Sequence, residues 1–210
     1  MKIKDSKLLL KINGKTVLER SVNAFLNISD VDEVIVVARE KDIPAFSDIL
    51  TDERVSFVVG GDTRQQSVMN AVDVIDDCKL IIIHDGARPL IKSEDIENTI
   101  RAAKENKAAA VGVFVKDTVK VVDKNGFVVS TPDRSTLFAV QTPQIFDFEL
   151  YRNAAQNARE KGLDFTDDCQ LVESFNQKVK TVVGSYSNIK ITTPDDIVLA
   201  ENLLKNEALI

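Results

Sequence analysis

The sequence has few of the residues on which covalent and zinc chemistry depend. Histidine occurs once, as His84, and cysteine twice, as Cys78 and Cys169, without the spacing of a metal site. No serine or cysteine lies in a recognisable nucleophile turn, so a catalytic triad is not expected. Because two cysteines come without a basic and then apolar leader, we expect free thiols and a cytoplasmic protein.

An excess of positive charge and long apolar runs are also missing. The formal net charge is -6, whereas a protein that binds nucleic acid regardless of sequence needs a basic face. The apolar runs are much shorter than the roughly 20 residues of a membrane-spanning helix. We therefore expect neither nucleic acid nor a membrane as a partner, although a few local lysines and arginines would suffice for a nucleotide site.

The 210 residues fit one domain, 1–210, better than two. Near-continuous apolar runs predict strands buried on both faces at 34–38, 55–59, 80–83 and 110–115. Helical patterns lie between them, with Asp62 and Ser93 as expected N-caps, at 63–75 and 93–106, and a last helix opens at Thr193-Pro194. This alternation predicts an α/β protein with a doubly wound, mostly parallel sheet.

Residues 118–131 break the alternation. Two β-rich runs flank Asn125-Gly126, which is a strong hairpin pattern. A surface decoration would explain the hairpin, but an isolated two-stranded ribbon is marginally stable in water. We therefore favour a β-arm, at about 116–138, that packs on a second subunit.

Candidate binding residues follow the predicted strands, because ligands of open α/β sheets bind beyond the carboxyl ends of the strands. The turn Gly60-Gly61-Asp62 could bring backbone close to a ligand, although on its own it is better explained as a glycine turn with a helix cap. Asp85 follows the strand 80–83, with Arg88 three residues on. The pair predicts either a salt-bridged turn or a carboxylate for a divalent cation beside a guanidinium for phosphate.

Further polar residues lie at other element ends. Arg134 is at the base of the hairpin, Thr142 is in a stretch that could be a proline turn, and Lys190 is in a β-like stretch where it could protect a sheet edge. No nucleophile or general base is prominent. This set favours phosphoryl or nucleotidyl transfer, in which the protein positions and neutralises charged groups; it comprises Lys7, Asp85, Arg88, Thr118, Arg134, Thr142, Thr166 and Lys190.

Seven stretches, taken in order, closely resemble the 2-C-methyl-D-erythritol 4-phosphate cytidylyltransferase family of the non-mevalonate isoprenoid pathway. Each stretch alone is weak, but together they run from Lys7 to the last helix. They are Gly60-Gly61-Asp62-x-Arg64-x-x-Ser67-Val68, His84-Asp85-Gly86-Ala87-Arg88-Pro89, Asp117-Thr118-Val119-Lys120, Asp133-Arg134-Ser135-x-Leu137, Gln141-Thr142-Pro143-Gln144, Phe165-Thr166-Asp167-Asp168 and Asn188-Ile189-Lys190-Ile191-Thr192.

The resemblance implies a Rossmann-like nucleotidyltransferase fold, a homodimer formed through the β-arm, and transfer of CMP from CTP to methylerythritol phosphate with Mg²⁺. The implied catalytic residues are Lys7, Asp85, Arg134 and Lys190, with the metal on Asp85. The implied residues for methylerythritol phosphate are Arg88, Thr142 and Thr166, with Thr118 and Arg134 of the partner subunit. The implied cytosine site is Gly61, Asp62 and Ser67.

Two departures from the family bear on activity. The family's first strand and glycine-rich loop are not found before Lys7, and Lys7 is framed by Ser6 and Leu8 rather than by proline and glutamine. Because the first strand of such a sheet is central, we expect the chain as written to be a poor or inactive cytidylyltransferase. The alternatives are a ribitol 5-phosphate cytidylyltransferase and a non-catalytic dimeric remnant.

Overall fold

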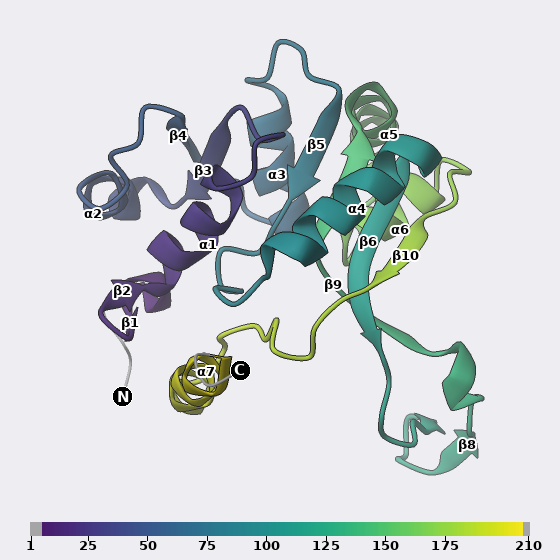
Figure 1. Cartoon of the computed structure of the whole chain (residues 1–210). Helices are drawn as coiled ribbons and strands as arrows, with labels where there is room; N and C mark the ends of the chain where they lie inside the picture. The colour runs from purple at the N-terminus through teal and green to yellow at the C-terminus, as the bar shows by residue number, and fades with distance from the viewer. Residues whose placement is uncertain (1–5, 208–210) are drawn as a thin grey trace.

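A computed structural model describes residues 6–207 of the chain (Figure 1). Its α-helices are α1 (Val17–Leu26), α2 (Ile43–Ser47), α3 (Arg64–Val72), α4 (Ser93–Asn106), α5 (Phe148–Lys161), α6 (Asp168–Glu173) and α7 (Pro194–Glu207). Its strands are β1 (Lys11–Ile12), β2 (Lys15–Thr16), β3 (Val34–Ala38), β4 (Val55–Val59), β5 (Leu80–Ile83), β6 (Ala108–Phe114), β7 (Val121–Val122), β8 (Val128–Ser130), β9 (Phe138–Asp147) and β10 (Lys180–Val183). The order of strands and helices confirms the α/β prediction.

The main sheet has the strand order β10-β6-β9-β5, and β3 pairs with β4 in a separate sheet. The pairs β3–β4 and β10–β6 are parallel, but β9 runs antiparallel to both β5 and β6. Because β5 and β6 both oppose β9, the strands β5, β6 and β10 run in one direction and β9 alone is reversed. The prediction of a mostly parallel sheet is confirmed, but the reversed strand β9 was not predicted. The sequence did not indicate β9 because polar Gln141, Thr142 and Gln144 interrupt its apolar pattern.

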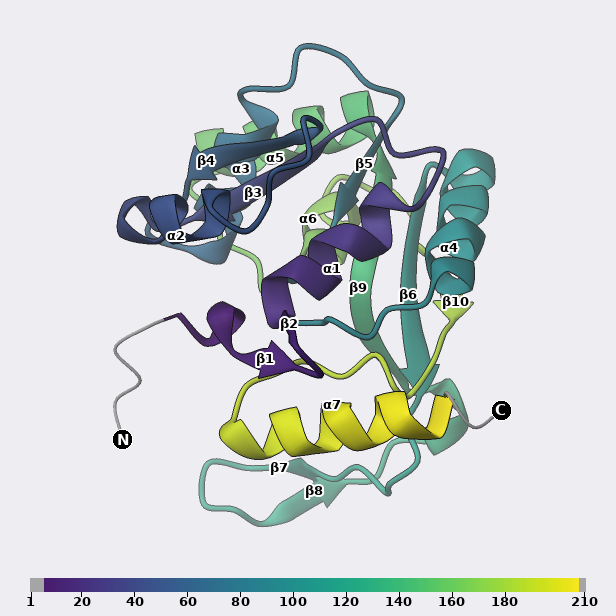
Figure 2. The same ribbon diagram turned by 60° about the vertical axis from the view of Figure 1, so that its left-hand side comes forward.

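Helices cover both faces of the main sheet. Along β6, Ala108 and Ala110 pack against α3, α5 and α6, whereas Ala109 and Val111 pack against α1 and α4. This is the alternation that a strand buried on both faces requires. Figure 2 shows α4 and α5 on opposite sides of β6 and β9. The fold is thus doubly wound, as predicted.

The two sheets are divided between β3 and β5. Among the described residues, no strand pairs with the edge of β3 that faces away from β4, or with the edge of β5 that faces away from β9. A cavity of about 1350 Å³ lies between them, lined by residues 34–37 of β3 and 80–83 of β5. Within residues 6–207, therefore, no strand joins β3 to β5.

Two expected helix caps are displaced by one residue. The N-cap of α3 is Thr63, whose hydroxyl oxygen accepts from the Gln66 N–H at 3.1 Å, while Asp62 donates its own N–H to Gln66 Oε1. The N-cap of α4 is Lys92, so Ser93 is the first helical residue instead of the cap. From the sequence alone, the N-cap residue could not be distinguished from the polar residue next to it.

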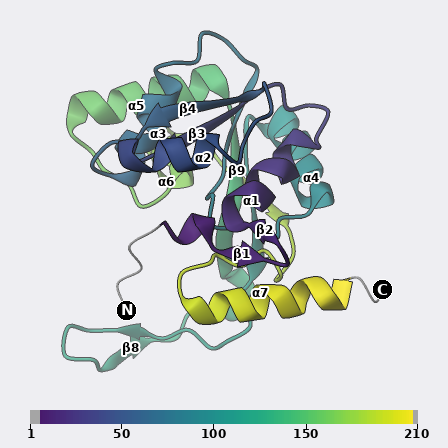
Figure 3. The ribbon, with the colours of Figure 1, turned by 90° about the vertical axis from the view of Figure 1, so that its left-hand side faces the viewer.

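The predicted hairpin is present, with β7 and β8 antiparallel and Gly126 at a φ of +85° in the connecting turn. Figure 3 shows this arm extending away from the rest of the chain. It is highly exposed and carries apolar side chains, among them Val122, Phe127, Val128 and Val129, of which Phe127 is 71% exposed. No helix within residues 6–207 is both long and apolar enough to cross a lipid bilayer.

Candidate active site

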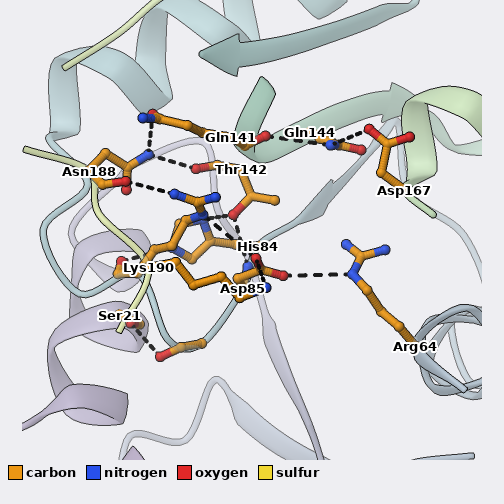
Figure 4. Close-up of polar contacts among 12 residues, drawn as sticks. Ser21, Arg64, His84, Asp85, Gln141, Thr142, Gln144, Asp167, Asn188 and Lys190 are labelled. Atoms are coloured by element: carbon orange, nitrogen blue, oxygen red, sulfur yellow. Dashed lines mark hydrogen bonds and ion pairs between the residues drawn. The ribbon is translucent and has the colours of Figure 1, made fainter. Parts of the chain in front are cut away.

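Asp85 lies at the centre of a cluster of charges at the carboxyl end of β5 (Figure 4). Lys190 Nζ is 2.8 Å from Asp85 Oδ2, and Arg88 Nε is 3.6 Å from the same oxygen. On the other side, Arg64 Nε is 3.7 Å from Oδ1. The side chain of Asp85 is only 16% exposed, so a half-buried carboxylate is balanced by three cations.

These neighbours decide the charge of Asp85. Burial alone would raise the pKa of this carboxyl, but the hydrogen bond and charge of Lys190, with the charges of Arg64 and Arg88, lower the pKa below its ordinary value. Burial lowers the pKa of Arg88, and Asp85 offsets part of that effect. Asp85 is therefore ionised at neutral pH and available to a cation.

Lys190 is positioned by the segment before α7. The Ile191 N–H donates to the Ala87 carbonyl at 2.7 Å, and the Ile191 side chain is 1% exposed. Arg88 Nη1 donates to the carbonyl of buried Asn188 at 2.8 Å. Residues 188–193 form no strand, so Lys190 does not protect a sheet edge, and that alternative is wrong.

A directed chain of hydrogen bonds fixes the backbone around Asp85. The Asp85 N–H donates to Thr142 Oγ1 at 3.0 Å, and Thr142 Oγ1 lies 3.1 Å from His84 Nδ1. His84 Nε2 lies 3.1 Å from the Arg88 carbonyl, which can only accept. Nε2 must therefore carry the proton and Nδ1 must accept from the Thr142 hydroxyl. Burial lowers the pKa of His84 to about 4, so the ring is neutral at physiological pH.

This chain gives His84 a structural contact that the sequence did not indicate. It also engages the predicted substrate residue Thr142, which is 4% exposed and whose hydroxyl proton is directed to His84. Arg88 differs, because its Nε is buried and has no hydrogen-bond partner within residues 6–207. A buried donor without a partner is costly unless a ligand satisfies it.

The predicted pair of lysines borders one cavity with Asp85. Lys7, Asp85 and Lys190 line a space of about 690 Å³. Lys7 begins the short 3-10 helix η1 (Lys7–Leu9), whose N-cap is Ser6, and its side chain is exposed. The structure therefore brings together two lysines from opposite ends of the chain, as the resemblance implied.

Two of the predicted nucleotide residues, Gly61 and Asp62, lie in the turn between β4 and α3, and the third, Ser67, lies in α3 itself. Ser67 Oγ accepts from the Gly61 N–H at 3.1 Å and donates to the Thr63 carbonyl at 2.9 Å. A Cβ on Gly61 would lie 2.6 Å from Gln66 Cβ, so a larger residue does not fit without a shift. Asp62 is exposed at the tip of the turn. Ser67 thus shapes this turn, and Gly61 and Asp62 are open to solvent.

The remaining predicted residues lie on other segments. Thr166 is exposed before α6, where its N–H and hydroxyl both donate to Gln170 Oε1. Thr118 and Arg134 are exposed on the arm, and Arg134 Nη1 donates to the Lys116 carbonyl at 2.8 Å. No hydrogen bond or ion pair joins these arm residues to Asp85 in the part of the chain that the structure describes.

Several residues of the site had no predicted role. Arg64 and Asp168 are in stretches that carry the family resemblance, but spacing does not reveal that Arg64 Nη2 lies 2.7 Å from Asp168 Oδ2. Gln144 is 2% exposed and bonds both Asp167 and the Cys169 N–H. Asn188 Nδ2 donates a hydrogen bond to the Thr142 carbonyl. Each contact joins residues far apart in the sequence, so no local pattern could have identified it.

One carboxylate fits a magnesium ion that substrate phosphates help to hold. Mg²⁺ commonly takes one or two carboxylates together with phosphate oxygens and water. Asp85 supplies such a carboxylate, and among the described residues its Oδ1 has only the long contact with Arg64. No group of three or more acidic, histidine or cysteine residues within 6–207 could hold a metal without a substrate.

A doubly wound α/β fold with a cluster of charged residues at a strand end, and no prominent nucleophile among residues 6–207, fits the class of enzymes that transfer phosphoryl or nucleotidyl groups. The sequence identifies the family within this class. Residues 1–206 match the family model for 2-C-methyl-D-erythritol 4-phosphate cytidylyltransferase, and the chain belongs to this family.

Relatives agree in sequence and in structure. The protein of that name from Caldanaerobacter subterraneus subsp. tengcongensis is 47% identical over 206 residues, which cover 95% of this chain and 91% of the relative. The one from Desulforamulus reducens is 43% identical over 202 residues, 93% of this chain and 86% of the relative. The crystal structure of 4-diphosphocytidyl-2C-methyl-D-erythritol synthase from Anaerococcus prevotii has a TM-score of 0.88 and 36% identity, covering 96% of this chain and 92% of that one.

Proposed function

We propose that this chain transfers CMP from CTP to 2-C-methyl-D-erythritol 4-phosphate. An oxygen of the methylerythritol phosphate attacks the α-phosphorus of CTP, the bond from that phosphorus to the bridging oxygen breaks, and pyrophosphate leaves. The observation that carries the proposal is the Asp85 cluster at the end of β5, in a chain of this family. Such a site stabilises phosphate charge and needs no protein nucleophile.

The proposed roles of Lys7, Lys190 and the magnesium ion follow from the positions of these lysines and Asp85 around one cavity. Lys190 and Lys7 border the cavity next to Asp85, so they would contact the α-phosphate and the charge that develops on it. Asp85 would hold Mg²⁺, which when bound neutralises phosphate oxygens. The Lys190 side chain is 44% exposed. When substrate binds, Lys190 would exchange its contact with Asp85 for a contact with phosphate.

The two substrates would be held by different segments. Arg88 Nε is buried, has no hydrogen bond within residues 6–207 and makes only the 3.6 Å ion pair with Asp85, so it would contact the methylerythritol phosphate, with Thr166 and Thr142 on neighbouring segments. The cytosine would lie against Gly61, Asp62 and Ser67, because a carboxylate or a backbone carbonyl can accept from the cytosine amine. Competition between methylerythritol phosphate and ribitol 5-phosphate in one assay separates the proposal from the nearest alternative.

We also propose a homodimer in which the arm completes the site. The exposed apolar side chains of β7 and β8 support an arm that packs on another subunit, because an isolated ribbon is marginal in water. Thr118 and Arg134 of the partner subunit would then reach the methylerythritol phosphate. A cytoplasmic location fits the two free cysteines.

The direct test is release of pyrophosphate from CTP and methylerythritol phosphate, with the CDP-alcohol identified by mass spectrometry. The 210-residue chain is assayed beside a version that includes any in-frame residues encoded before Met1. Formation of CDP-methylerythritol by either version supports the proposal. Preference for ribitol 5-phosphate, or binding without turnover by both versions, contradicts it.

A further inference from the structure

Arg64 connects three segments of the site but is not among the residues proposed to contact substrate. It is the first residue of α3 and follows the nucleotide turn directly. Its Nε lies 3.7 Å from Asp85 Oδ1, and its Nη2 lies 2.7 Å from Asp168 Oδ2. Asp168 begins α6, two residues after Thr166. One guanidinium therefore links the segments proposed to bind cytosine, metal and methylerythritol phosphate.

The Asp168 end of this link is anchored in the core. The side chain of Asp168 is 2% exposed, and its Oδ1 accepts from the Tyr151 hydroxyl at 2.6 Å. Tyr151, on α5, is fully buried in the cluster that α5, α6 and the main sheet share. Burial, together with the charge of Asp168, raises the pKa of Tyr151, so its hydroxyl stays protonated and donates.

The next residue makes a second connection to the same segment. Gln65 is 8% exposed; its Nε2 donates to the Leu163 carbonyl at 2.8 Å, and its Oε1 accepts from the Phe165 N–H at 2.9 Å. Thr166 thus lies between two attachment points, Gln65 on one side and Arg64 on the other. The start of α3 holds both ends of residues 163–168.

We propose that Arg64 is a positioning residue that sets Asp85 at a fixed place relative to Thr166 and the nucleotide turn. Its planar fork can address two carboxylates in different directions, whereas the single ammonium of lysine can satisfy one. Arg64 carries its charge between a buried anion on one side and the half-buried Asp85 on the other. The consequence for catalysis rests on the proposed function, but the connection itself does not.

A purely structural ion pair is the competing explanation. It predicts that loss of Arg64 lowers the melting temperature and affects turnover only through the folded fraction. A positioning role predicts loosening confined to residues 163–168 and a lower kcat in a protein that is still folded. The two explanations therefore differ in where the change appears.

Hydrogen exchange of the free protein tests the connection without substrate. The variant is Arg64→Gln. The matched control is Arg159→Gln on α5, which breaks an exposed ion pair between Arg159 Nη2 and Asp73 Oδ2, 2.9 Å apart. We expect amides of residues 163–168 to exchange about tenfold faster in Arg64→Gln and to be unchanged in Arg159→Gln. Unchanged exchange in both variants would overturn the proposal.

Steady-state kinetics test the consequence. In Arg64→Gln we expect kcat to fall about 10- to 100-fold, the range found when a residue supporting a metal ligand is lost. Arg64→Lys should recover only part of this loss, and millimolar guanidinium should partly restore Arg64→Ala. Asp168→Asn should add little further loss to Arg64→Gln, because both variants break the same connection.

The kinetic outcomes are decisive in both directions. Wild-type kcat in Arg64→Gln, or full recovery by Arg64→Lys, would overturn the positioning role. If neither the 210-residue chain nor the version with any in-frame residues before Met1 forms CDP-methylerythritol, the proposed function fails by itself. Hydrogen exchange then decides whether Arg64 holds residues 163–168.

Discussion

Lys190→Ala tests the proposed chemistry most directly, because one ammonium serves both Asp85 and the α-phosphate. The variant removes a positive charge 2.8 Å from Asp85 Oδ2. We expect kcat to fall about 10²- to 10³-fold, the effect of deleting one donor that stabilises a transition-state anion. This corresponds to about 2.7–4 kcal/mol of barrier.

The expected effect on stability is much smaller. The Lys190 side chain is 44% exposed, and an ion pair with one exposed partner contributes about 1 kcal/mol or less to the free energy of unfolding. For a chain of this size that amounts to a change in melting temperature of about 2–4 °C. Loss of turnover should therefore greatly exceed loss of folded protein at the assay temperature.

The assay measures pyrophosphate release at saturating CTP and methylerythritol phosphate, in whichever version of the protein turns over. Lys104→Ala is the matched control, because Lys104 Nζ lies 2.7 Å from Asp30 in an exposed pair remote from the cluster. The control should keep its kcat. Near-normal kcat in Lys190→Ala, or an equal loss in Lys104→Ala, would refute the proposed role.

Three further predictions concern the dimer, the pH dependence of stability and the divided sheet. Mixing inactive Arg134→Ala and Lys190→Ala chains should restore partial turnover, since one hybrid site keeps both groups; no recovery despite demonstrated subunit exchange would contradict a shared site. His84 has a pKa of about 4 in the folded protein and about 6.5 when unfolded. Between about pH 6.5 and pH 4 the unfolded chain binds a proton on His84 that the folded chain does not bind, so the free energy of unfolding decreases as pH falls through this range. Denaturant titrations at pH 7 and pH 4.5 should show a loss of at most about 3 kcal/mol that His84→Gln lacks. A version that places an apolar strand between β3 and β5 should melt at a higher temperature and turn over faster than the 210-residue chain; equal melting and turnover would show that the divided sheet has no such cost.

Strands with near-continuous apolar runs were predictable to within two residues, since the predicted range 110–115 corresponds to β6 at Ala108–Phe114. The predicted ranges 34–38, 55–59 and 80–83 coincide with β3, β4 and β5, because burial on both faces favours a run that is almost entirely apolar, with Ser56 in β4 as the one polar residue. β9 was missed for the opposite reason, since its polar residues bond other segments and are satisfied only in the folded chain. Gln144, for example, bonds Asp167 and the Cys169 N–H.

The candidate site was predictable where it depends on strand ends. Asp85 follows β5 directly, and Arg88 is in the same turn, so local sequence was enough to pair them. The family resemblance assigned Lys190 and Asp85 to one site, but their contact with each other was not predicted. The contacts of Arg64 with Asp168 and of His84 with Thr142 depend on how α3, α6 and β9 pack, which no spacing in the sequence encodes.

The divided sheet explains why such long-range contacts matter for Asp85. Asp85 leaves β5, and among the described residues β5 is paired along one edge only, by β9. The cavity on its other side is lined by residues 80–83 and also by Asp85 itself. A strand with one free edge constrains its last residue less than a strand paired on both sides, because half of the inter-strand hydrogen bonds are missing. The place of Asp85 must then be set by contacts other than strand pairing on that side. Thr142 on β9 accepts from its N–H, Lys190 contacts one carboxylate oxygen, and Arg64 approaches the other. Filling the cavity with a paired strand would make those contacts less critical, so the effect of Arg64→Gln should be larger in the 210-residue chain than in a version whose sheet is continuous.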